Sequence, residues 1–155
     1  MSVAEVLRRA PLFQGFSDTG LLIFASISLE RSAPAGAVLV EEDAPSESLL
    51  IVRTGSVRLV HRGPDGDQDL GSLTAGGHLG ALALLAPGPS LVGAVAATDV
   101  ELLELRARDF ARLQPQKPQA CLKLALAIAA DLARAASGAR GPLREALRRA
   151  AGTRS

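Results

Sequence analysis

The residues with the clearest capacity for chemistry lie in a glycine-rich stretch near the middle of the chain, residues 75–97. A turn at Gly76 leads through Gly80 into a short apolar stretch that predicts one turn of helix. The first N–H groups of a helix have no partner within it, and the helix dipole favours negative charge there. The backbone amides of Gly80, Ala81 and Leu82 are therefore expected to converge as an anion-binding site.

A proline-glycine-proline break at residues 87–89 follows, and then a run of small apolar residues that predicts a strand over residues 91–98. Ser90 lies between the break and the strand. A serine hydroxyl can donate a hydrogen bond to a phosphate oxygen, but it supplies no charge. We therefore take Ser90, Leu91 and Val92, together with the three amides, as the candidate ligand-binding residues.

The remaining reactive side chains are few and scattered. His78 lies in the turn before the short helix, where it is either a phosphate contact or an exposed turn residue. Cys121 is the single cysteine, so no disulfide can form within the chain. One cysteine and two separated histidines are too few for a zinc or iron–sulfur site, or for the His-rich cluster of a metal-binding jelly roll. No Gly-x-Ser-x-Gly or phosphate-loop motif occurs, so we expect no catalytic residue, no metal and no enzyme activity.

The elements that must position these residues are read from hydrophobic periodicity. Helical patterns cover residues 3–26, interrupted where Pro11 ends the first helix. Over residues 28–105 the period changes to two, and turn residues separate short runs typical of a β barrel. We predict strands at residues 29–33, 37–40, 48–53, 56–62, 68–74, 91–98 and 100–105.

After residue 105 the pattern is helical again. One helix is predicted over residues 106–113, a longer one begins at Gln119 and ends at Ala136, and a last short one covers residues 143–151. The predicted fold class is mainly β with flanking helices, a β barrel or jelly roll between N-terminal helices and a C-terminal helix. One domain is predicted over residues 1–136, followed by a short basic helical tail at 137–155. Within the domain, a helical lead covers residues 3–26, a barrel covers 28–105 and C-terminal helices cover 106–136.

Three blocks of sequence carry a family pattern. Residues 7–18 contain Pro-Leu-Phe and end in Ser-Asp, residues 34–39 read Pro-x-Gly-x-Val-Leu, and residues 48–57 read Ser-Leu-Leu-Ile-Val-x-x-Gly-x-Val. With the stretch around Gly80, these blocks resemble the cyclic nucleotide-binding domain, the ligand module of catabolite-activator-type regulators, cyclic-nucleotide-dependent kinases and gated channels. The resemblance covers residues 3–136. It implies a regulatory domain built as an eight-stranded jelly-roll barrel (double-stranded β-helix). The phosphate-binding cassette of this family reads roughly Phe-Gly-Glu-x-Ala-Leu-Leu and, after a gap, Pro-Arg-x-Ala-x-Val-x-Ala.

Two cassette positions depart from this family pattern. The glutamate that holds the ribose hydroxyl in the family falls on Ala81, and the arginine that pairs with the cyclic phosphate falls on Ser90. Each loss removes a charged hydrogen bond worth about 1.5–3 kcal/mol. The affinity is therefore expected to fall by about a hundredfold to several-thousandfold. Arg53 or Arg58 could replace the charge from an inward-facing position, but alternation with apolar neighbours predicts that both point outward.

These observations predict a stand-alone, non-catalytic regulatory or sensor domain. Its expected ligand is cyclic AMP, cyclic GMP or another small anion, bound weakly if at all. The alternative is a degenerate member of the family that acts as a protein-interaction or dimerisation module without nucleotide, with a protein partner that the sequence does not identify.

The helix from Gln119 to Ala136 bears on the oligomeric state. Its apolar residues cover more than half of its circumference, whereas packing on one barrel needs a stripe of about 100°. The excess predicts a homodimer through this helix, with alanine richness alone as the alternative.

Charge is unevenly divided along the chain. Residues 1–116 carry nine arginines and fourteen acids, a net charge of −5, whereas residues 117–155 carry eight basic residues and two acids, a net charge of +6. The basic end suits either an anionic partner or a solvated surface. Only nineteen residues follow Ala136, too few for a base-reading helix-turn-helix, so no specific DNA binding is expected. With no leader peptide and no apolar stretch of membrane-spanning length, a cytoplasmic protein without a membrane span is predicted.

Overall fold

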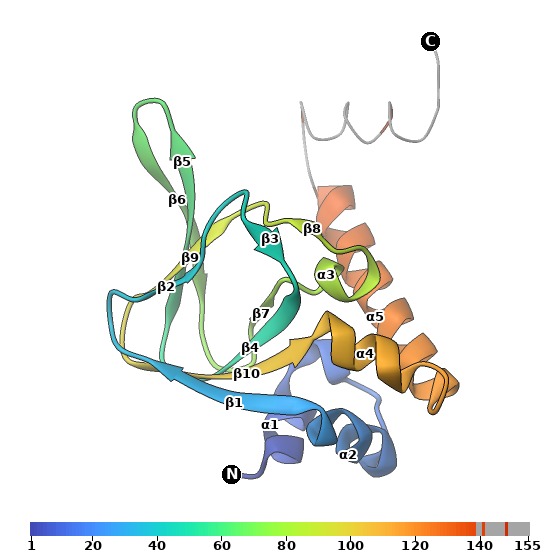
Figure 1. Ribbon diagram of the computed structural model, residues 1–155. Helices are drawn as coiled ribbons and strands as arrows, with labels where there is room; N and C mark the ends of the chain where they lie inside the picture. Colours follow the sequence, from blue (N-terminus) through green and yellow to red (C-terminus); the bar gives the residue numbers. More distant parts are fainter. Residues whose placement is uncertain (139–140, 142–147, 149–155) are drawn as a thin grey trace.

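Six helical segments flank the strands in the computed structural model, which describes residues 1–138, 141 and 148 (Figure 1). Local signals in the sequence start the first of them. Ser2 and Glu5 form a capping box at the start of helix α1. At the start of helix α2, the Ser17 hydroxyl accepts a hydrogen bond of 3.0 Å from the Gly20 amide. The helices are α1 (Val3–Arg9), η1 (Pro11–Phe13), α2 (Asp18–Ser26), α3 (Leu82–Leu85), α4 (Ala107–Leu113) and α5 (Pro118–Gly138).

The strands of the described residues form three antiparallel sheets. The first has the order β1-β10-β4-β7, the second β2-β9-β5-β6, and the third is the pair β3-β8. The β5–β6 hairpin projects beyond the rest of the sheets (Figure 1). The strands are β1 (Ser28–Ala33), β2 (Val38–Val40), β3 (Pro45–Ser46), β4 (Ser48–Thr54), β5 (Val57–Gly63), β6 (Gly66–Leu73), β7 (His78–Leu79), β8 (Gly88–Pro89), β9 (Gly93–Ala96) and β10 (Val100–Arg106).

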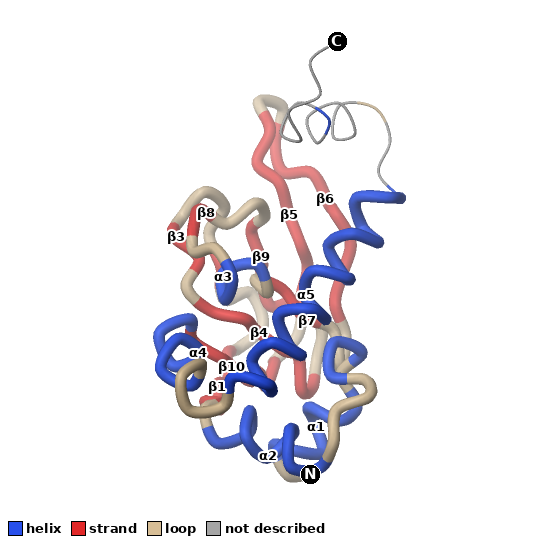
Figure 2. Tube along the Cα trace, turned by 90° about the vertical axis from the view of Figure 1, so that its right-hand side faces the viewer, coloured by secondary structure: helices blue, strands red, loops and turns tan. Residues whose placement is uncertain are grey.

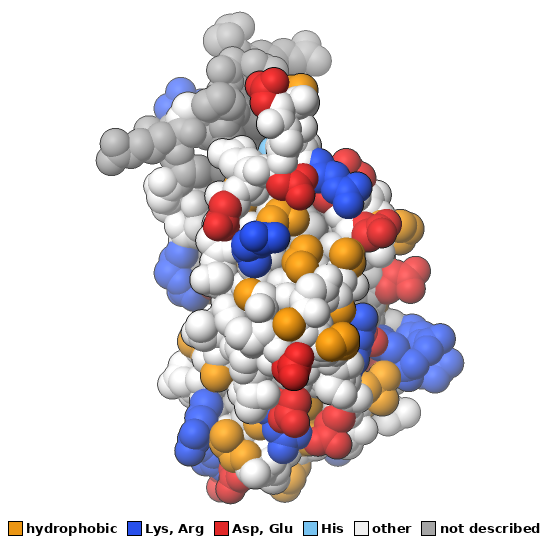
Figure 3. Space-filling view, turned by 90° about the vertical axis from the view of Figure 1, so that its left-hand side faces the viewer, with side chains coloured by type: hydrophobic (Ala, Val, Ile, Leu, Met, Phe, Trp, Pro, Cys, Tyr) orange, Lys and Arg blue, Asp and Glu red, His pale blue; other side chains and the backbone are white. Residues whose placement is uncertain are grey.

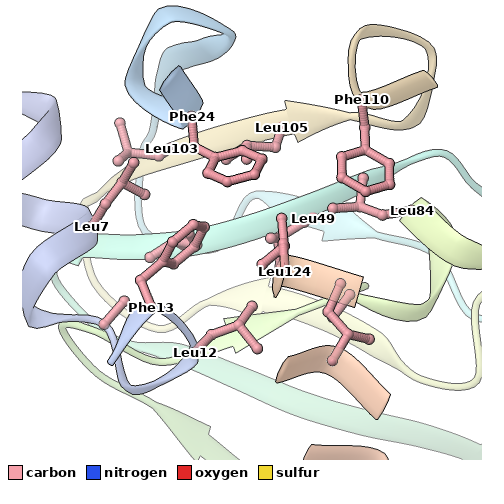
Figure 4. Close-up of a cluster of buried hydrophobic side chains, with 14 of the residues drawn as sticks. Leu7, Leu12, Phe13, Phe24, Leu49, Leu84, Leu103, Leu105, Phe110 and Leu124 are labelled. Carbon is pink, nitrogen blue, oxygen red and sulfur yellow. The ribbon is translucent and has the colours of Figure 1, made fainter. Parts of the chain in front are cut away.

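Strand β4 is buried on both faces, because a core lies on each side of it. Leu50 and Val52 point into an apolar cluster between the sheets. Leu49 and Ile51 point the other way, into a second cluster formed with the helices. Figure 4 shows Leu49 in this second cluster, near Leu124 of α5. Side chains of a strand alternate between its faces, so the continuous apolar run of β4 follows from its central place.

The second cluster also fixes the start of α5. Phe13, Phe16 and Phe24 meet edge to face, with ring centroids 5.0–6.0 Å apart. The ammonium group of Lys123 lies 5.0 Å from the Phe16 ring centroid and donates to the Gly15 carbonyl at 2.6 Å. The first half of α5 is thereby held against the N-terminal helices.

The predicted class, mainly β with helices on both sides, is confirmed, and so are the end of the first helix before Pro11 and the short helix after Gly80. The eight-stranded closed barrel is corrected, because the described strands divide into three sheets that do not close on one another. The three two-residue strands were not predicted, since no periodicity is visible in two residues. Most of the predicted tail, with its helix at 143–151, lies outside the described residues.

Most predicted bounds shift by one or two residues, and two of the differences bear on the site and on the C-terminal helix. The strand expected at 91–98 is only Gly93–Ala96, and the Leu91 side chain is 78% exposed in the loop before it. The helix expected from Gln119 to Ala136 begins at Pro118 and continues to Gly138. Proline at the first helical position is tolerated, because the N–H that it lacks has no partner there.

On the face that Figure 3 shows, acidic and basic side chains are interspersed with apolar groups, and neither charge dominates. Among the described residues, no helix combines the length and apolar character needed to cross a bilayer.

Candidate functional site

The turn at Gly80 connects β7 to α3, and its backbone conformation requires glycine. Gly80 has φ of +80°, and a Cβ placed on it would lie 2.4 Å from the carbonyl oxygen of Ser48. Left-handed backbone is unfavourable for residues with a side chain, and no such side chain fits at this distance. The turn is thereby held closely against the start of β4.

Helix α3 follows directly from this turn. The amides of Ala83 and Leu84 donate back to the carbonyls of Gly80 and Ala81, at 3.0 and 3.1 Å. The amides of Ala81 and Leu82 precede the first intrahelical donor, so they are the groups that a ligand can use. Leu82 is 40% exposed, but Ala81 is only 8% exposed and belongs to the cluster under the helices.

Ser90 is placed by the turn between β2 and β3. Its carbonyl accepts from the amide of Asp43, and its amide donates to the carbonyl of Ala44, both at 2.8 Å. Its hydroxyl donates to the carbonyl of Val92 at 2.7 Å, and the residue is 8% exposed. The predicted hydroxyl donor therefore already has an acceptor within its own loop, and it can donate to a ligand only by rotating away.

The β2–β3 turn is itself clamped to β5. The Glu42 carboxylate accepts from the Arg62 amide at 2.8 Å and pairs with the His61 imidazole. The backbone hydrogen bond from Arg62, and then the one from His61, hold the pKa of Glu42 below its ordinary value. The Glu42 carboxylate thus holds the β2–β3 turn against β5. The same turn contains Asp43, whose amide donates to the Ser90 carbonyl. Asp43 has φ of +65°, a conformation that aspartate tolerates better than most residues.

His78 departs from the sequence-based expectation. The prediction of an exposed turn residue is wrong, because the side chain is only 16% exposed. Its Nε2 atom lies 3.1 Å from Oδ2 of Asp131 in α5. The imidazole therefore joins the strand before the Gly80 turn to the C-terminal helix, across 53 residues of sequence.

The two arginines considered as replacement charges lie elsewhere. Arg53 donates to the Glu30 carboxylate at 2.6 Å and to the Met1 carbonyl, so its outward orientation is confirmed. Arg58 is exposed and lies opposite Ser72 and Val95 in its sheet. Neither supplies a cation beside Gly80.

A cavity of about 700 Å³ opens between the first sheet and the β2–β3 segment. At this cavity, the residues of β1 and β10 that line it are charged. Nη1 of Arg31 lies 3.4 Å from Oε2 of Glu104, and Arg106 also belongs to the lining. None of the six predicted ligand-binding residues lines it, although Pro87 of the loop after α3 does. The cavity nevertheless adjoins the Gly80 turn, because Ser48, whose carbonyl oxygen faces Gly80, is part of its lining.

The family model for the cyclic nucleotide-binding domain matches residues 30–116, which is more than half of the chain. The chain belongs to the cyclic nucleotide-binding domain family. The matched residues include β4, the Gly80 turn, Ser90 and α4.

The curated relatives of this cyclic nucleotide-binding domain are larger proteins. A cyclic nucleotide-gated potassium channel of Rhizobium etli is 30% identical over 115 residues, 74% of this chain and 31% of the channel. A CRP-like cAMP-activated global transcriptional regulator of Mycobacterium tuberculosis is 28% identical over 102 residues, 65% of this chain and 46% of the regulator. The chain therefore spans between about a third and half of the length of these relatives.

Solved structures agree with the fold. The N-terminal domain of a Streptomyces coelicolor transcriptional regulator superposes with a TM-score of 0.77 at 30% identity, covering 84% of this chain and 92% of that one. The Thermus thermophilus catabolite activator protein gives 0.70 at 30% identity, covering 81% of this chain and 60% of that one.

The structure gathers some of the predicted site residues and not others. Gly80, Ala81 and Leu82 form one turn, whereas Leu91 projects into solvent and Ser90 is bound within its loop. Sequence reasoning missed Ser48, whose carbonyl fixes Gly80, and Asp131, the partner of His78. No local signal marks either residue, because each acts through a contact with a distant segment.

Proposed function

We propose that this cyclic nucleotide-binding domain is a non-catalytic sensor that binds a cyclic nucleotide or another small anion at the Gly80 turn. The observation that supports this most directly is the left-handed Gly80, held against Ser48 so that the free amides of Ala81 and Leu82 begin α3. Within this family, such a turn is where the resemblance places the phosphate.

The proposed binding is weak, because the side chains that would hold the nucleotide are absent. Ala81 offers no carboxylate for a ribose hydroxyl, and Ser90 offers no charge for the phosphate. The Ser90 hydroxyl also loses its hydrogen bond to Val92 if it turns toward a ligand. Backbone amides alone remain as donors.

Titration calorimetry with cyclic AMP and cyclic GMP tests the proposal. We expect a dissociation constant in the sub-millimolar to millimolar range, and no binding of adenosine as a neutral control. A micromolar constant would show that the missing side chains are replaced from elsewhere. An absence of heat at millimolar cyclic nucleotide would favour the alternative, an interaction module without nucleotide.

We also propose that α5 forms a homodimer with a second copy of the chain. Cys121, Leu124 and Ile128 face the core, but Leu122 and Leu126 on the opposite side are 59% and 61% exposed. Leu132 is also exposed, but it follows Ile128 by four residues and so lies on the core-facing side of the helix, apart from Leu122 and Leu126. An apolar stripe of this kind can be covered by the same stripe of a two-fold partner, which makes the contact self-complementary.

Sedimentation of a Leu126→Glu variant tests this dimer. A carboxylate opposite its symmetry mate is expected to shift the protein to monomer at concentrations where the wild type is dimeric. Leu29→Glu is the matched control, since Leu29 is 41% exposed on β1, at the opposite edge of the first sheet from β7, the strand whose His78 contacts α5. If the wild type sediments as a monomer, the homodimer proposal is wrong.

A further inference from the structure

The cavity of about 700 Å³ between the first sheet and the β2–β3 segment has the size of a small-molecule pocket, for which about 300–1,000 Å³ is typical. One wall comes from β1, the end of β10 and the start of β4, and the other comes from β2, β3 and the turn between them. Figures 1 and 2 both show the β3–β8 pair above the junction of β10 and α4. None of the amides of the Gly80 turn lines this cavity.

Strand β10 changes from apolar to charged along the side that faces the cavity. Leu102 is buried in the cluster between the sheets, and Glu104 and Arg106 follow it at alternate positions of the strand. Alternate residues share a face, and Glu104 lies directly opposite Leu50, which belongs to the same cluster. Charged groups are costly to bury, so packing alone does not account for two of them on the side of β10 that elsewhere builds the core.

These two charged groups are not paired with each other within the described part of the chain. Nη1 of Arg31 lies 3.4 Å from the Glu104 carboxylate, which is longer than a strong charged hydrogen bond. Nε of Arg106 donates to Asp109 at 2.7 Å, which orients the guanidinium and leaves its two terminal nitrogens. The side chains of Glu104 and Arg106 are 19% and 32% exposed. The cavity therefore presents one half-buried anion and one half-buried cation, each with further hydrogen-bonding capacity.

An apolar wall lies beside these two charges. Leu39 and Leu50 are 8% and 3% exposed, and both line the cavity. Alternate residues of a strand are about 7 Å apart, so the long side chains of Glu104 and Arg106 can converge on one small molecule. A simple anion at Arg106 would be repelled by the Glu104 carboxylate, and a simple cation at Glu104 would be repelled by the Arg106 guanidinium. A molecule that carries both charges meets neither repulsion.

We propose that this cavity is a second ligand site, which binds a small zwitterion with an apolar body, the chemistry of a free aliphatic amino acid. The Arg106 guanidinium binds the carboxylate, the Glu104 carboxylate binds the ammonium group, and the aliphatic side chain packs on Leu39 and Leu50. The site uses none of the amides of Ala81 and Leu82, so it does not rest on the function proposed for the Gly80 turn.

Nuclear magnetic resonance titration of the full chain with L-leucine tests this site. The methyl signals of Leu39 and Leu50 are expected to shift and to saturate at millimolar ligand. Isocaproic acid has the same carbon skeleton without the ammonium group, and isopentylamine lacks the carboxylate. Each should bind about tenfold to a hundredfold more weakly, because it loses one charged hydrogen bond. No saturable shift with L-leucine would overturn the proposal, and so would binding of either analogue as tightly as L-leucine.

A variant of the anionic side chain identifies the ammonium contact. Glu104→Gln is expected to weaken L-leucine binding by about tenfold or more, and to leave isocaproic acid bound at least as well as before, since a repulsive charge is removed. Glu101→Gln is the matched control, because Glu101 lies on the same strand outside the lining of the cavity. Unchanged binding of L-leucine to Glu104→Gln would contradict the proposal. The comparison of the three compounds on the wild type decides the matter even if this variant is unstable.

Discussion

Replacing Ala81 by glutamate and Ser90 by arginine in one variant is expected to raise the affinity for cyclic AMP by about a hundredfold to several-thousandfold. The pair restores the two charged groups that the family pattern places at these positions. An arginine can pair with the cyclic phosphate through two parallel hydrogen bonds, and a glutamate can accept from a ribose hydroxyl. Titration calorimetry on the wild type and the variant gives the comparison directly.

The two positions differ in how readily they accept the change. Ala81 is 8% exposed within the apolar cluster, so a carboxylate there is costly unless a ligand or a polar neighbour pairs with it. Ser90 is also 8% exposed, but a long arginine side chain can leave the loop. We therefore expect Ser90→Arg alone to improve affinity by about tenfold to a hundredfold with less loss of thermal stability than Ala81→Glu.

Controls separate charge from shape. Ser90→Met adds length without charge and is expected to leave the affinity unchanged. Ala81→Gln tests whether the carboxylate charge is needed. A folded double variant that gains no affinity would show that the pocket is closed by other side chains, and it would count against the sensor proposal for the wild-type chain.

Sequence reasoning was most successful where a local chemical rule decides the outcome. Pro11 was predicted to end the first helix, and α1 ends at Arg9; the apolar run at residues 48–53 was predicted to be a strand, and β4 covers Ser48–Thr54. Gly80, which the sequence places in the turn before a short helix, has the left-handed backbone that glycine adopts without strain. These features can be predicted from neighbouring residues alone.

It was less successful where a residue's role depends on a partner far along the chain. A helical wheel of α5 shows a wide apolar band. Only the structure shows which part of this band is buried against the rest of the protein, with Leu124 buried and Leu126 exposed. Likewise, nothing in the local sequence shows that the Ser90 hydroxyl turns to Val92. Nor does it show that His78 meets Asp131 in α5.

Gly80→Ala is expected to lower the free energy of unfolding by about 2–5 kcal/mol, the sum of a left-handed backbone penalty and a forced displacement. The added Cβ would lie 2.4 Å from the Ser48 carbonyl, which is backbone of a central strand and cannot rotate away. The Gly80 turn must then move away from β4, which displaces the amides of Ala81 and Leu82. Any binding of cyclic AMP is therefore expected to disappear as well.

Gly36→Ala separates the two contributions. Gly36 has φ of +87°, close to that of Gly80, but a Cβ there would have no neighbour within 4 Å. This variant should therefore lose only about 1–2 kcal/mol and keep the cassette intact. Urea unfolding of both variants measures the difference. Equal losses of unfolding free energy would mean that backbone strain alone makes glycine necessary at position 80, and that the contact with Ser48 does not hold the turn. A much larger loss in Gly80→Ala would mean that close packing of the turn on β4 positions the amides of Ala81 and Leu82.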